Sequence, residues 1–76
     1  MKKSTEVEVR GALNVIMSDV KSFKTSLNYA INYVDAARSM TGYELAVQCL
    51  YILNNITHWR HPEAKNVRLI LKSFKG

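Results

Sequence analysis

The chain is 76 residues long, which allows one folding unit and leaves only a few kcal/mol of net stability from apolar burial. Its single cysteine excludes an internal disulfide, and no cysteine pair flanks a histidine pair at zinc-finger spacing. The formal net charge is +5, and residues 46–76 carry five basic side chains against Glu63 alone. This distribution suits either a surface that binds a polyanion or a solvated helix face.

The N-terminus resembles the start of a signal peptide only in its first three residues. Met1-Lys2-Lys3 is followed at 4–8 by Ser-Thr-Glu-Val-Glu, where a signal peptide requires an apolar run. Nowhere do eighteen apolar residues follow one another, as a membrane-spanning helix requires. We therefore expect a soluble protein of the cytoplasm with no membrane partner, folded as a single domain over 1–76.

The first expected element is one long helix from about residue 5 to about residue 39. Apolar residues recur along it in alternating steps of three and four, without an error, at Leu13, Ile16, Val20, Phe23, Leu27, Ala30, Val34 and Ala37. This spacing is a heptad seam, which favours a continuous helix even though 22–26 contains loop-like serine and threonine. Thr5 and Glu8 form a capping-box pattern at its start.

Two shorter helices are expected after it, at about 42–58 and 62–74. Thr41 and Glu44 form a second capping-box pattern, and the helix that follows is apolar on most sides, which indicates burial on most sides. Pro62 suits the first position of the last helix. On that helix, the basic residues Lys65, Arg68, Lys72 and Lys75 form a stripe beside its apolar residues.

The sequence predicts an all-α fold whose helical bundle is completed by homo-oligomerisation. The last helix either folds back on the second or continues roughly in line with it. Either layout leaves apolar surface that the chain cannot cover, so we expect a dimer or higher oligomer. The expected interface residues come from the seam: Leu13, Ile16, Val20, Phe23 and Leu27.

The segment His58-Trp59-Arg60-His61 between the last two helices is the first candidate ligand site. An indole beside an arginine suits the stacking of a base and the binding of a phosphate, and the start of the next helix adds free N–H groups. The alternative is structural: the tryptophan closes the corner between two helices and Arg60 pairs with a carboxylate. Lys65, Arg68 and Lys72 complete the expected ligand-binding set.

Other chemistry finds little support in the sequence. His58 and His61 lack a cysteine or a third histidine nearby, so we expect no metal site. Cys49 lies among apolar residues, where a thiol acts as a small hydrophobic group with a raised pKa. No Gly-rich loop or Ser/His/Asp arrangement is present, so we expect no enzyme activity and no cofactor.

The last third of the chain resembles the small open reading frames carried by bacteriophages and prophages. The resemblance rests on three blocks: Leu-Tyr-Ile-Leu-Asn-Asn-Ile-Thr-His-Trp-Arg at 50–60, Pro-Glu-Ala-Lys-Asn-Val-Arg at 62–68 and Leu-Lys-Ser-Phe at 71–74. It implies a protein of the bacterial host cell that disables a host factor, binds nucleic acid or captures a nucleotide signal of host defence. We expect a non-enzymatic accessory protein that binds a nucleotide or nucleic acid. The alternative is an inhibitor or adaptor that binds a host protein through an apolar helix face.

Overall fold

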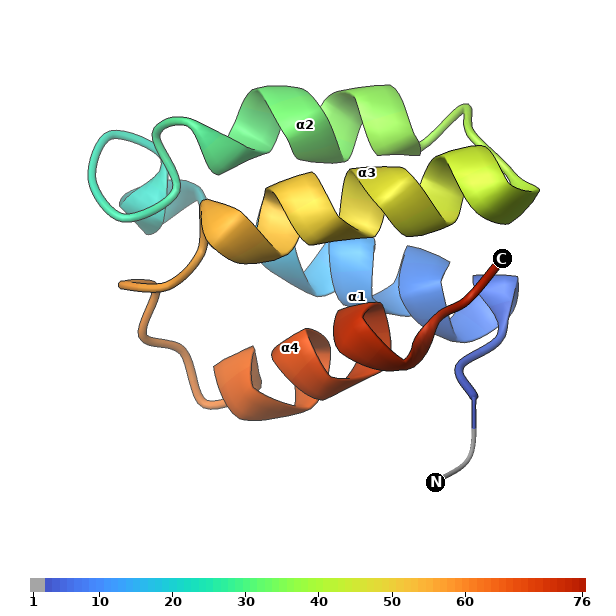
Figure 1. Ribbon diagram of the computed structural model, residues 1–76. Helices are drawn as coiled ribbons and strands as arrows, with labels where there is room; N and C mark the ends of the chain where they lie inside the picture. The colour runs from blue at the N-terminus through green and yellow to red at the C-terminus, as the bar shows by residue number, and fades with distance from the viewer. Residues whose placement is uncertain (1–2) are drawn as a thin grey trace.

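The computed structural model describes residues 3–76 and forms an antiparallel four-helix bundle (Figure 1). Met1 and Lys2, where the comparison with a signal peptide begins, lie outside the described residues. The elements are α1 (Glu6–Ser18), the short 3-10 helix η1 (Val20–Ser22), α2 (Ala30–Ala37), α3 (Gly42–Asn54) and α4 (Ala64–Ser73). Residues 3–76 contain no strand, which confirms the all-α prediction.

The helices enclose one hydrophobic core. Successive α-helices run in opposite directions, and the contacts α1·α2, α2·α3, α3·α4 and α1·α4 arrange them in a ring (Figure 1). Each helix directs an apolar stripe inward, represented by Ile16 on α1, Val34 on α2, Ile52 on α3 and Leu71 on α4, all of which are buried. The last helix therefore folds back on the one before it, which decides between the two layouts left open above.

The single long helix predicted over 5–39 is wrong, because α1 ends at Ser18 and α2 begins at Ala30. Hydroxyl groups hold the intervening segment in turns: the Ser22 hydroxyl donates to Asp19 Oδ2 at 2.7 Å, and the Thr25 hydroxyl donates to the Ser22 carbonyl at 3.3 Å. Short polar side chains that bond locally compete with helical bonding. The chain thus reverses direction where the apolar spacing predicted continuity.

This reversal changes the role of the predicted seam. Leu13, Ile16 and Leu27 are buried within the chain itself, and Phe23 packs partly buried against the same core. Val20 differs, because its side chain is 65% exposed. The seam therefore supplies the core of a single chain, and its predicted role as an oligomer interface loses its basis. Homo-oligomerisation itself stays a prediction.

The predicted starts of α1 and α3 hold better than their predicted ends. The Thr5 hydroxyl accepts from Glu8 N at 3.2 Å and Glu8 Oε1 accepts from Thr5 N at 2.9 Å, which confirms the first capping box. Thr41 is the N-cap of α3, but its side chain makes no capping bond, so the second predicted capping box does not form. Glu6 Oε2 of α1 accepts from Gly42 N, the first N–H of α3, at 2.9 Å. The predicted ranges 42–58 and 62–74 shorten to Gly42–Asn54 and Ala64–Ser73.

Candidate interaction surface

The hinge between α3 and α4 is built around a buried tryptophan. Trp59 is 1% exposed, and its Nε1 donates to Asp19 Oδ2 at 2.7 Å. Its ring stacks on the imidazole of His61, with centroids 5.2 Å apart and planes 22° from parallel. The hydrogen bonds from Trp59 and Ser22 lower the pKa of Asp19, because both favour the charged carboxylate. The indole therefore closes a corner of the core, as the structural alternative predicted, and offers no open face for a stacked base.

The remaining hinge residues do not converge on a ligand site. His58 and Arg60 are exposed, and neither makes a hydrogen bond or an ion pair within residues 3–76. His61 Nδ1 accepts from Glu63 N at 3.0 Å, so this histidine shapes the approach to α4. The expected pairing of Arg60 with a carboxylate is not made among residues 3–76. No three His, Cys, Asp or Glu side chains gather within the described part of the chain.

Three of the four residues of the predicted basic stripe lie along a groove between α3 and α4; the fourth, Lys75, lies beyond the end of α4 and does not line the groove. Lys65, Arg68 and Lys72 line this groove together with Leu53 and Leu69, whereas His58 and Arg60 do not line it. Arg68 is also structural: its guanidinium donates to the Trp59 carbonyl at 3.3 Å and to the Ile56 carbonyl at 3.5 Å. Three of the predicted ligand-binding residues are therefore brought together, and the four of the hinge are not.

The outer face of α3 is an apolar surface that the sequence predicted to be buried. Tyr43 is 78% exposed, Leu50 56% and Tyr51 50%, while the inward positions Leu45 and Ile52 are fully buried. Tyr51 stacks on the Tyr33 ring of α2, with centroids 5.9 Å apart. The signal was present in the sequence: a helix that is apolar all round needs cover on both sides, and a bundle of four short helices covers only one.

We call the combined area the α3–α4 surface. It comprises the outward apolar residues of α3, the half-exposed leucine of α4 and the cations beside it: Tyr43, Val47, Leu50, Tyr51, Leu53, Leu69, Lys65, Arg68 and Lys72. Leu50 lies three residues before Leu53 on α3, so the two are neighbours on its surface, and Leu53 lines the groove with the cations. Tyrosine and arginine are enriched in protein interfaces because each combines a large contact area with polar groups.

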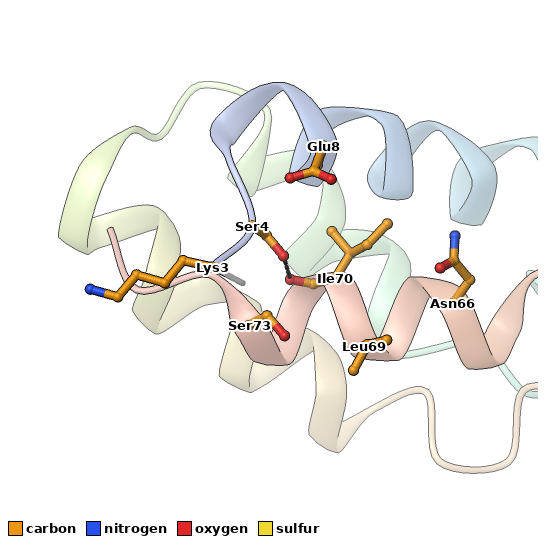
Figure 2. A pocket seen from close by; sticks show the side chains of 7 residues that line it. All are labelled: Lys3, Ser4, Glu8, Asn66, Leu69, Ile70 and Ser73. Atoms are coloured by element: carbon orange, nitrogen blue, oxygen red, sulfur yellow. Dashed lines mark hydrogen bonds between the residues drawn. The ribbon is translucent and has the colours of Figure 1, made fainter. Parts of the chain in front are cut away.

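A second hollow lies between the N-terminal segment, α1 and α4 (Figure 2). Its lining residues are Lys3, Ser4, Glu8, Asn66, Leu69, Ile70 and Ser73. The Ser4 hydroxyl donates to the Ile70 carbonyl at 2.7 Å and Ser4 N donates to the Ser73 carbonyl at 3.1 Å, so these contacts attach the N-terminal segment to α4. Its two charges, Lys3 and Glu8, are opposite in sign, and the arrangement favours no ligand class.

Comparisons with protein-family models, curated proteins and solved structures gave no match to this chain. Within residues 3–76, no helix has both the length and the apolar character needed to cross a membrane.

Proposed function

We propose that this chain is a non-enzymatic adaptor or inhibitor that binds a partner protein through the α3–α4 surface. The observation that carries the proposal is the exposed apolar face of α3, where Tyr43, Leu50 and Tyr51 are each at least half exposed. Single exposed apolar residues are common on proteins, but a contiguous set on one helix is typical of an interaction site. Burial of such side chains is worth about 25 cal/mol for each Å² removed from water, which a partner recovers on binding.

The phage resemblance of residues 50–74 favours a host protein as the partner. Small phage-carried proteins commonly act by binding a host factor, and such an action needs an interaction surface rather than a catalytic pocket. On this proposal the chain works inside the bacterial host cell, where it occupies a surface of one host protein.

A nucleotide or nucleic acid is the second candidate ligand, favoured by the convergence of Lys65, Arg68 and Lys72 on one groove. Burial of Trp59 removes the aromatic stacking surface on which the hinge hypothesis depended. A nucleic acid would therefore bind through its phosphates, and each neutralised phosphate contributes about 0.9 to the slope of log affinity against log salt.

Site-specific photo-cross-linking in bacterial host cells tests the proposal. A photoreactive phenylalanine analogue replaces Leu50 on the α3–α4 surface, and the matched control carries it at Val20, which is equally apolar and 65% exposed. We expect a discrete protein adduct from position 50 that position 20 does not give. The partner identified by mass spectrometry should then bind the purified chain, and Leu50→Lys should abolish that binding.

The other possible results of the cross-linking experiment contradict the proposal. The same adducts from both positions, or none from position 50, would refute it. An adduct of twice the chain's mass would assign the surface to a second copy of the chain. Cross-linking to nucleic acid would support the second candidate.

A further inference from the structure

The groove between α3 and α4 is lined by both apolar and basic side chains. Leu53 and Leu69 supply apolar surface, and Lys65, Arg68 and Lys72 supply three positive charges with long aliphatic stems. We propose that this groove binds an acidic amphipathic helix of the partner protein. The inference rests on the proposed function and specifies the chemistry of the segment that the partner presents.

The cations of the groove carry charge that the chain itself does not neutralise. Within residues 3–76 the ion pair that forms joins Arg10 to Glu6, at 3.6 Å, and none involves Lys65, Arg68 or Lys72. Arg68 is held in place by its bonds to the Ile56 and Trp59 carbonyls. A fixed guanidinium between two lysines favours carboxylates as the complementary groups.

The spacing of the cations matches a helix. Lys65, Arg68 and Lys72 stand at i, i+3 and i+7 of α4, so they follow one face over about 10 Å. A partner helix that lies along α4 with acidic residues at i, i+3 or i+4, and i+7 presents its carboxylates at the same intervals. Its adjoining apolar residues would then cover Leu53 and Leu69, as in other grooves that bind helices.

Two other occupants fit the groove less well. A nucleic acid backbone would neutralise the cations but would gain little from the leucines, one of which, Leu69, is 50% exposed. A second copy of the chain would be repelled by the groove, because the chain carries a net charge of +5 and the groove is also positively charged. An acidic amphipathic helix satisfies both parts of the lining at once.

Selection from a displayed library of peptides tests the inference. The library contains randomised segments of about 15 residues, which form roughly four helical turns, and the bait is the purified chain. We expect enriched peptides with Asp or Glu spaced three and four residues apart beside an apolar stripe. Synthetic copies are then measured by fluorescence anisotropy against the parent chain and its variants.

The variants separate the groove from general electrostatics. Lys65→Glu with Lys72→Glu should weaken binding of the selected acidic peptides at least about tenfold, as expected for the reversal of two opposed charges. Arg68 is kept because it supports the hinge. The control, Lys21→Glu with Lys24→Glu, makes the same change of net charge at exposed positions before α2 and should weaken binding less than about twofold. Leu69→Ser should weaken binding several-fold with little loss of stability.

Three results would overturn the inference: no enriched peptides, enriched peptides without acidic residues, or equal losses from the groove variant and its control. A 20-nucleotide single-stranded or duplex DNA that binds tighter than the peptides, and loses affinity on Lys65→Glu with Lys72→Glu, would overturn it in favour of nucleic acid. The cross-linking experiment separates the two proposals, because a partner captured at Leu50 whose contact segment is not an acidic helix contradicts the inference alone.

Discussion

Replacement of Trp59 by alanine should be the most destabilising change at the hinge. The side chain is 1% exposed, packs on His61 and donates from Nε1 to Asp19. Truncation of a buried tryptophan costs about 3 to 5 kcal/mol through lost apolar burial and the cavity left behind. A chain of 76 residues has a net stability of only a few kcal/mol, so the variant should retain little of it.

The matched variant is Arg60→Ala, one residue away on the same hinge. Arg60 is exposed and makes no bond in the described part of the chain, so its loss should change the free energy of unfolding by less than about 0.5 kcal/mol. Thermal unfolding followed by circular dichroism should show Tm at least about 12 °C lower for Trp59→Ala and almost unchanged for Arg60→Ala. A Trp59→Ala protein that melts within a few degrees of the parent, or an Arg60→Ala protein that falls equally far, would refute this account of the hinge.

Three further changes test other parts of the structure. The folded state lowers the pKa of Asp19, so the Asp19 carboxylate stabilises the fold at any pH above its pKa in the unfolded chain. This stabilisation is lost as the pH falls through the pKa of Asp19 in the folded chain. Asp19→Asn should therefore lower Tm near neutral pH and make Tm fall less steeply as the pH is lowered. Burial raises the pKa of Cys49 to about 11, so the native thiol should react with a disulfide reagent at pH 7 far more slowly than the same thiol in denaturant, and equal rates would contradict its burial. Thr5→Ala should cost about 1 kcal/mol in urea unfolding, and no change would show that the capping box contributes nothing.

A local signal predicted the start of α1 because the groups involved lie within one turn. The Thr5 capping box needs only Glu8, three residues away, and it forms as predicted. Thr41 does not repeat this pattern, because its side chain makes no capping bond. The N–H of Gly42 donates to Glu6, which is far away in sequence and comes near only when the chain folds. A pattern of adjacent residues carries no information about such a distant partner.

The long helix failed for a related reason. Alternate steps of three and four predict which side chains point inward, but two antiparallel helices joined by turns also direct side chains such as Ile16 of α1 and Val34 of α2 into one core. The polar segment between them held the contrary signal. What fixes the break is the Asp19 carboxylate, which accepts from Ser22 nearby and from Trp59 forty residues later.

The candidate site was predictable in part. The convergence of Lys65, Arg68 and Lys72 follows from their spacing on one helix, whereas the exposure of Leu50 depends on how many helices cover α3. The apolar excess of α3 was visible in the sequence, but it was interpreted as burial on most sides. The hypothesis that Trp59 stacks on a ligand base failed because the sequence alone does not reveal whether the indole N–H has an acceptor inside the chain.

The ring of helices also sets the order in which the protein can mature on the ribosome. α1 packs against α2 and α4, so half of its cover is synthesised last. At roughly 5 to 20 residues per second, several seconds separate the emergence of α1 from that of α4, and the side of α1 that contacts α4 is uncovered throughout that interval. Translation speed and nascent-chain chaperones should therefore affect the yield of this chain more than its small size suggests.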